Sequence, residues 1–290
     1  MDHINESKKL LESSDKTICL LAPSFVAEYE YPNIIYRLRA LGFDEVVELT
    51  FGAKMTNLSY YAILKEDIDR TWISSPCPTI VNLIKTKYPH LKRNLMPVHS
   101  PMGCMSLICH KFYPEHKQIF VGPCITKKSE AKDIGGIEAA LSYKELDQLF
   151  EEMNIPKKIT DEKYMKTFDK FYNDYTKIYP LSGGLSETLH HNHILKKKEI
   201  YVGEGMKNVM NIFDNFKDGW YKKYKFLDIL TCEGGCIGGP GMANHYPLKQ
   251  RRKRVLKYRD YARRYEKDLG RRGTKIKAEG ISFERKFTDE

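Results

Sequence analysis

The stretch LTCEGGCIGGPG at positions 230–241 places two cysteines among five glycines, directly after the apolar run FLDIL at 226–230. A short run of apolar and branched residues that ends at turn-forming residues predicts a β-strand followed by a tight loop. Glycine has no Cβ, so the loop backbone can approach a bulky inorganic group closely. We therefore expect the fold to be organised around cysteine-bearing loops at strand ends.

The same order, a short apolar run followed by a turn, recurs along the chain and predicts further strands. Such runs lie at 17–22, 45–51, 71–74, 118–121 and 199–202, and Gly52 is the turn residue expected after the second of them. Helical patterns separate them, and Ser142 with Glu145 forms a capping box that opens one of these helices. Strands that alternate with helices predict an α/β fold with mainly parallel sheets.

The composition is that of a folded globular protein, with 41% hydrophobic and 30% charged residues in 290. The longest nearly apolar run, 18–27, is about half of the roughly 20 residues that a membrane-spanning helix needs. The N-terminal residues MDHINESKK contain no apolar segment of the kind found in secretory signals. We therefore expect no membrane span and a cytoplasmic location.

The net charge of +10 is concentrated at the C-terminus. Residues 249–290 hold sixteen Lys and Arg against seven Asp and Glu, whereas residues 1–248 are nearly neutral. This asymmetry predicts a main domain at 1–248 and a basic, largely helical C-terminal tail at 249–290. Such a tail can bind an acidic protein, nucleic acid or anionic lipid, or can simply be a solvated helix.

The cysteines carry the strongest chemical signal. Seven is an odd number and no CxxC occurs, so we expect reduced thiols that bind metal or act in catalysis. Cys77, Cys124 and Cys232 follow predicted strands, and the carboxyl ends of parallel strands share one edge of a sheet. With Cys236, four thiolates match a 4Fe–4S cluster, and tetrahedral zinc is the chemical alternative.

Several motifs together resemble the catalytic domain of the iron-only (FeFe) hydrogenases. They are LLAPS (20–24), SSPCPTIVNLIKTKYP (74–89), SPM (100–102), VGPCITKKSEA (121–131), SGGLSETL (182–189) and LTCEGGCIGGPG (230–241). The resemblance implies two lobes of mainly parallel sheet, flanked by helices, with an H-cluster between them at the carboxyl ends of the strands. It also implies reversible oxidation of H2 to protons and electrons.

The H-cluster of that family joins a 4Fe–4S cluster to a diiron unit that carries carbon monoxide, cyanide and an azadithiolate. By resemblance, Cys77, Cys124, Cys232 and Cys236 ligate the 4Fe–4S cluster, and Cys236 also bridges to the diiron unit. Lys127 corresponds to the lysine that donates a hydrogen bond to a cyanide. Further positions of the cofactor pocket match Ala22, Pro23, Ser100, Met102, Glu130, Gly234, Gly235 and Gly238.

Other positions depart from the family pattern, and most of them concern proton transfer. Pro76 replaces a proton-relaying cysteine, Met96 a serine, and Tyr60 and Ile63 stand where relay glutamates lie. Met102, Gly122 and Leu230 also differ from the family residues. Loss of the relay predicts slow turnover, as in family members proposed to sense H2. An iron–sulfur assembly protein with a 4Fe–4S cluster alone is a further alternative, which Lys127 and the complete GGCIGGPG loop disfavour.

The expected partners follow from this chemistry: H2 and protons, maturation proteins for the diiron unit, and an acidic ferredoxin-type electron carrier. In the tail, an apolar stripe of Val255, Tyr258, Ala262 and Tyr265 predicts packing against the domain. The arginines, which lie mostly off this stripe, would face the carrier: Arg251, Arg252, Arg254, Arg259 and Arg263. The remaining thiols, Cys19, Cys104 and Cys109, are expected in the core, although Cys104 is a candidate substitute relay thiol. The cluster His190–His193 is expected to be a solvated cap.

Overall fold

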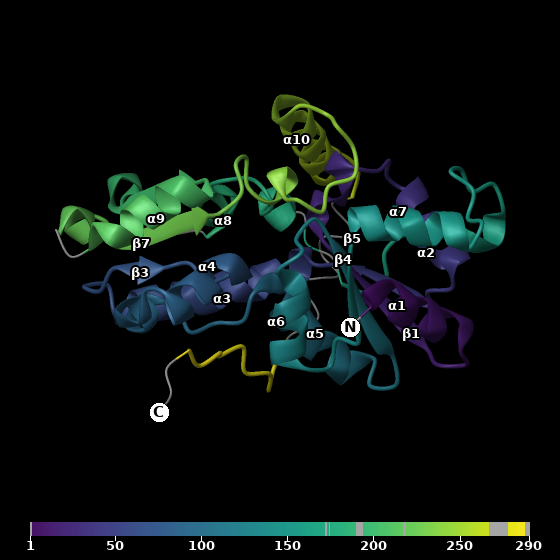
Figure 1. Cartoon of the computed structure of the whole chain (residues 1–290), viewed down its shortest axis with the longest axis horizontal. Helices are drawn as coiled ribbons and strands as arrows, with labels where there is room; N and C mark the ends of the chain where they lie inside the picture. Colours follow the sequence, from purple (N-terminus) through teal and green to yellow (C-terminus); the bar gives the residue numbers. More distant parts are fainter. Residues whose placement is uncertain are drawn as a thin grey trace.

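Two parallel sheets lie in opposite halves of the molecule, as the computed structural model shows (Figure 1). The first has the order β2-β1-β4-β5, formed by β2 (Glu45–Glu48), β1 (Thr17–Leu21), β4 (Lys117–Gly122) and β5 (Ala139–Ser142). The second has the order β3-β7-β6, formed by β3 (Trp72–Ile73), β7 (Phe226–Leu230) and β6 (Ile200–Glu204). The structure describes residues 2–171, 173, 175–189, 194–216, 219–266 and 278–287. The predicted class, α/β with parallel sheets flanked by helices, is confirmed.

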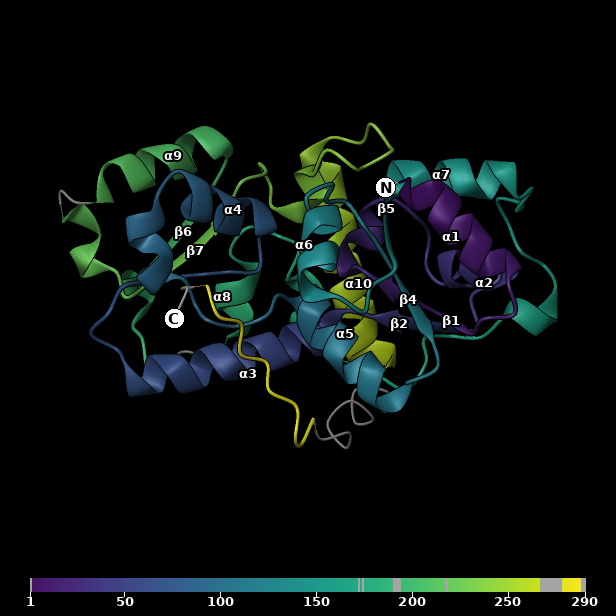
Figure 2. The same ribbon diagram turned by 60° about the horizontal axis from the view of Figure 1, so that its bottom comes forward.

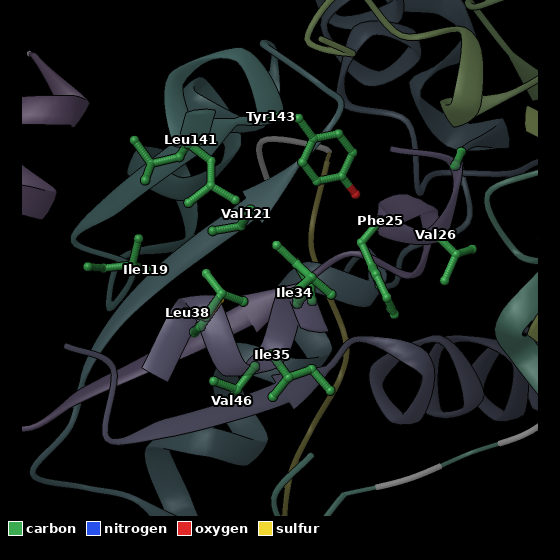
Figure 3. Close-up of a cluster of buried hydrophobic side chains, with 14 of the residues drawn as sticks. Phe25, Val26, Ile34, Ile35, Leu38, Val46, Ile119, Val121, Leu141 and Tyr143 are labelled. Atoms are coloured by element: carbon green, nitrogen blue, oxygen red, sulfur yellow. The ribbon is translucent and has the colours of Figure 1, made fainter. Parts of the chain in front are cut away.

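Both faces of the first sheet are buried, which explains its nearly continuous apolar strands. Side chains of β1 and β4 alternate between two cores. One core holds Cys19, Leu21 and Val121, with Phe25 and helix α2 (Asn33–Leu41) packed on them (Figure 3). The other core is covered by α3 (Thr50–Glu66) and α5 (Pro101–Phe112). Also beside this sheet lie α1 (His3–Glu12), α6 (Lys127–Ile134) and α7 (Tyr143–Glu152).

The second sheet has a separate core formed with α4 and α9. Ile80 and Ile84 of α4 (Pro78–Thr86) and Val209 of α9 (Met206–Asp214) pack with Leu227 of β7. Helix α8 (Gly184–Thr188) precedes this sheet's strand β6 in the chain. Short 3-10 turns complete the described chain: η1 (Pro23–Ala27), η2 (Pro89–Asn94), η3 (Glu162–Tyr164), η4 (Tyr175–Ile178), η6 (Lys197–Glu199), η8 (Trp220–Lys223) and η9 (Cys236–Gly238).

Two expectations about local structure are wrong. The strand expected at 45–51 ends at Glu48, because Thr50 already begins helix α3. Gly52 is not a turn residue but lies inside α3, where a Cβ would come within 2.3 Å of the Pro101 carbonyl oxygen of α5. The glycine therefore permits the close crossing of these two helices. Strand β5 is an additional element that the sequence analysis did not predict.

The C-terminal residues pack on both halves of the molecule. In α10 (Leu248–Tyr265), Val255, Tyr258 and Ala262 are buried, whereas Tyr265 is 67% exposed. Arg251 and Arg254 differ from the expectation, because they donate hydrogen bonds to backbone carbonyls instead of facing a partner. Beyond α10, the described residues 278–287 form no helix. The cluster His190–His193 lies outside the described residues. None of the helices in the described ranges has the length and apolar character of a membrane span.

Candidate functional site

A cavity of about 690 Å³, counted with its opening to solvent, lies at the carboxyl ends of strands from both sheets. Strand β1 leads into Ala22 and Pro23, β4 into Pro123 and Cys124, and β7 contributes Asp228 and Leu230 to its lining. Most of the lining is apolar. The chemically active side chains in it are Ser24, Cys124, Lys127, Tyr179, Asp228 and Cys236.

The four predicted ligand cysteines lie on three strand-to-loop junctions. Cys77 is the N-cap of α4 after β3, Cys124 lies between β4 and α6, and Cys232 follows β7 in the same loop as Cys236. Thr79 and Thr126 hydrogen-bond through their hydroxyls at 2.9 Å, which joins the loops of Cys77 and Cys124 across the two halves. Cys124 and Cys236 line the cavity.

Cys77 lies next to the loop of Cys232, since its Sγ is 3.5 Å from the hydroxyl of Thr231. Burial raises the pKa of the Cys236 thiol, and Cys124, Cys77 and Cys232 raise it further. The pKa of Cys232 rises to about 11, first by burial and then through Cys77 and Cys124. In the described part of the chain, no three Cys, His, Asp or Glu side chains are grouped tightly enough for a single metal ion. A bound cationic metal deprotonates such thiols, and four thiolates are the donor set of a 4Fe–4S cluster.

The glycines after Cys232 shape the loop. Gly235 has φ +83°, and a Cβ there would lie 2.5 Å from the Pro180 carbonyl oxygen. The amide of Cys236 donates to that same carbonyl at 2.7 Å, which fixes the position of the thiol. Gly234 lies under Leu248, and a Cβ on Gly238 would collide with the Glu233 carbonyl oxygen. The three glycines expected to contact the cofactor thus hold the loop backbone in place, and their contact with a cofactor stays a prediction.

Lys127 lines the cavity, and its ammonium is held by three polar neighbours. Its ammonium donates to Glu130 Oε2 at 2.5 Å, to Ser100 Oγ at 2.8 Å and to the Pro76 carbonyl at 3.3 Å. Glu130 is 2% exposed, and Arg285 donates to its other carboxylate oxygen at 2.9 Å. Three of the predicted pocket residues, Ala22, Pro23 and Met102, line the cavity beside Lys127.

Of the substituted relay positions, Tyr60 and Met96 are buried, whereas Pro76 and Ile63 are partly exposed. Pro76 lines the cavity, and the preceding Ser75 hydrogen-bonds with the Tyr60 hydroxyl at 2.8 Å. Met96 is fully buried. The predictions of core positions for Cys19, Cys104 and Cys109 are confirmed, since all three are 0% exposed. Cys104 contacts the Thr56 hydroxyl at 3.3 Å, and burial raises the pKa of its thiol to about 12.

Sequence reasoning missed three polar residues of this region. Asp228 is buried in the cavity wall, where it accepts a hydrogen bond from the Ser186 amide at 3.0 Å and burial raises its pKa. The buried Tyr179 hydroxyl has no hydrogen-bond partner among the described residues. Arg285 reaches Glu130 from 155 positions further along the chain. The acidic Asp228 inside the apolar run FLDIL is a signal that the sequence does contain. No neighbouring residues in the sequence indicate a role for Tyr179 or Arg285.

We expect Gly235→Ala to destabilise the loop and to reduce iron binding during anaerobic reconstitution. The backbone there (φ +83°, ψ −153°) costs a side chain about 1–3 kcal/mol, and the clash with Pro180 adds to this. Gly135→Ala is the matched control, because Gly135 has a similar backbone (φ 73°, ψ 164°) and open space, with no atom within 4 Å, where the alanine Cβ would lie. Equal iron content and melting temperature in the two variants would contradict the assigned role of the loop.

Comparisons with known proteins agree with this arrangement. The family model "Iron only hydrogenase large subunit, C-terminal domain" matches residues 15–240. Iron hydrogenase 1 of Clostridium pasteurianum is 26% identical over 84% of this chain and 53% of its own length. The periplasmic Fe hydrogenase large subunit of Nitratidesulfovibrio vulgaris is 22% identical over 81% of this chain and 70% of its own length. The chain spans about half the length of the first of these relatives.

Solved structures share the fold. An FeFe-hydrogenase of Chlamydomonas reinhardtii aligns with a TM-score of 0.68 at 15% identity, covering 99% of this chain and 100% of that one. A structure that describes stepwise H-cluster assembly aligns with a TM-score of 0.67 at 16% identity, over 88% of each chain. With the family model matched over most of its length and the fold shared, this chain belongs to the iron-only hydrogenase large-subunit family, of which it contains the C-terminal domain.

Proposed function

We propose that this chain binds an H-cluster and catalyses the reversible oxidation of H2 to protons and electrons. The observation that carries the proposal is that Cys124 and Cys236, from the two halves of the fold, line one apolar cavity together with Lys127. Cys77 and Cys232 lie in the adjoining loops, where Cys77 Sγ is 3.5 Å from the hydroxyl of Thr231. The donor set supports a 4Fe–4S cluster, and the cavity next to Cys236 offers space for a diiron unit. Membership of the family supports the same cofactor.

Each residue of the site has a distinct part in this proposal. Cys77, Cys124, Cys232 and Cys236 would supply the thiolates. Both Cys124 and Cys236 line the cavity, and the resemblance to the family assigns the bridge to Cys236. The Lys127 ammonium donates a hydrogen bond to a cyanide ligand, a contact that suits a compact point charge. Ala22, Pro23 and Met102 keep the cavity apolar and exclude water. When bound, the cofactor would supply the redox chemistry, and maturation proteins would deliver its diiron unit.

Infrared spectroscopy of the maturated chain tests this proposal, because metal-bound carbon monoxide and cyanide absorb where the protein does not. We expect such bands, with changes between argon and H2, and we expect Cys236→Ala to abolish them through loss of the bridging thiolate. Cys109→Ala is the control, since Cys109 is a buried thiol of the α5 core that is not among the residues lining the cavity. Absence of the bands from the unaltered chain would leave only the assembly-type alternative with a 4Fe–4S cluster. If Cys236→Ala keeps these bands, the assignment of Cys236 as the bridging ligand is wrong.

A low-turnover H2 sensor of the same family is the second candidate, and Pro76 is the observation that favours it. Pro76 lines the cavity but has no proton to transfer, and the neighbouring Ser75 hydroxyl donates to the carbonyls of Met96 and Val98. Turnover is therefore expected to be limited by proton transfer.

We expect Pro76→Cys to raise H2 turnover, by up to about a hundredfold, a typical contribution of one acid–base group. Pro76→Ala serves as the control, since it removes the ring without adding a proton donor. Turnover measured with an artificial electron acceptor separates this step from partner docking. If the alanine and cysteine variants turn over at the same rate, proton transfer at this position does not limit the reaction.

We propose an acidic ferredoxin-type carrier as the electron partner, docking on the first half of α10. Leu248 packs on Gly234, and Arg251 donates to the Ile237 carbonyl, so α10 begins against the loop of Cys232 and Cys236. Exposed cations follow on this helix: Arg252, Lys253, Lys257, Arg263 and Arg264. Complementary charge of this kind mainly accelerates association.

Arg252→Glu with Lys253→Glu should therefore slow ferredoxin reduction at low salt, and the difference should shrink as salt screens the charges. Lys163→Glu, on the exposed turn η3 beside α2, provides a charge-reversal control away from this helix. If the rate of ferredoxin reduction changes neither with these substitutions nor with salt concentration, ferredoxin does not dock on this surface.

A further inference from the structure

The described residues 278–287, here called the C-terminal strap, run apart from α10 and reach the half of the molecule that holds α4 (Figure 2). The strap pairs with the segment just before α5. The His99 amide donates to the Phe283 carbonyl at 2.9 Å, and the Arg285 amide donates to the Pro97 carbonyl at 3.0 Å. Phe287, 6% exposed, closes the strap against the core of the second sheet.

The strap reaches both side chains that hold the Lys127 ammonium. Its pairing with residues 97–99 fixes the backbone that leads into Ser100, whose hydroxyl accepts from Lys127 at 2.8 Å. Its Arg285 guanidinium binds Glu130, which accepts from Lys127 through its other carboxylate oxygen. The side chains of Lys127 and Arg285 are each 11% exposed, so this charge cluster is largely shielded from water.

Lys127 and Arg285 share the Glu130 carboxylate, and Arg285 also lies 3.6 Å from Asp133 Oδ2. An ammonium has three N–H donors, and all three have acceptors here, the longest bond being the 3.3 Å contact with the Pro76 carbonyl. Glu130 divides its negative charge between Lys127 and Arg285. Without Arg285, the carboxylate would attract Lys127 alone and draw it more strongly toward α6. With Arg285 present, the weakest of the three bonds can be exchanged for a ligand in the cavity.

We propose that Arg285, presented by the C-terminal strap, is a positioning residue that sets the availability of the Lys127 ammonium to a cyanide ligand in the cavity. Arg285 lies outside residues 15–240, the part that matches the family model. The inference rests on the proposed function, because it gives Lys127 a cyanide partner. The link from the strap to Ser100 and Glu130 does not depend on the cofactor.

The first test uses the cofactor-free chain and amide hydrogen exchange. We expect Arg285→Gln to speed exchange at residues 98–100 and in the first turn of α6 by at least about tenfold, since the buried Glu130 carboxylate loses one of its two cationic partners. Amides of α9 act as an internal reference for global destabilisation. Lys286→Gln is the matched control, because Lys286 is the exposed neighbour in the same strap and carries the same charge. Unchanged local exchange in Arg285→Gln would overturn the proposal.

The second test uses the maturated chain and its infrared cyanide bands. Arg285→Gln should shift one cyanide band, Arg285→Lys should restore most of its position, and Lys286→Gln should leave it unchanged. In a Glu130→Gln background, Arg285→Gln should add no further shift, because the carboxylate that links Arg285 to Lys127 is gone. Bands that stay in place in Arg285→Gln, or that shift equally without Glu130, would overturn the positioning role. Absence of cyanide bands from the unaltered chain would instead contradict the proposed function. The hydrogen-exchange experiment on the cofactor-free chain would then still test the link from the strap to Ser100 and Glu130.

Discussion

The meeting of partly buried thiols from two separate sheets is the constraint on which the rest of this structure depends. A parallel sheet presents all its carboxyl ends at one edge, and here the ends of β4 and β7 face the same cavity. Burial and mutual repulsion disfavour ionised thiols at this place, as the raised pKa values of Cys124, Cys232 and Cys236 show. Bound iron would relieve that cost, so cluster binding and the stability of the junction are expected to be coupled.

The two halves are joined by elements that belong to neither sheet. The Thr79–Thr126 hydrogen bond, the loop of Cys232 and Cys236, and helix α10 all connect them close to the cysteines. Pro123 illustrates how tight the contact is, because its carbonyl accepts from the Gly241 amide at 2.9 Å and leaves no room for a Cβ on that glycine. Close backbone contacts thus determine the shape of the site, and only a few positions contribute reactive side chains.

Short apolar runs followed by turn residues were sufficient to predict most of the strands and the position of the cysteines at strand ends. Cys77, Cys124 and Cys232 each follow a strand whose apolar run is visible without tertiary information. Strand β5, AALS, is four residues long and contains no β-branched or aromatic residue, so its pairing with β4 is a tertiary effect. Gly52 was misread because helix crossings leave no local pattern, and Arg285 was missed because its partner lies 155 positions away.

Anaerobic reconstitution followed by iron and sulfide analysis and Mössbauer spectroscopy tests the central claim most directly. The account predicts one 4Fe–4S cluster per chain, lost when Cys77, Cys124, Cys232 or Cys236 is replaced by alanine. Replacement of Cys104 or Cys109, which lie in the α5 core, should leave the cluster intact. A cluster that survives loss of Cys77, or a chain that binds a single zinc ion in place of iron and sulfide, would contradict the account.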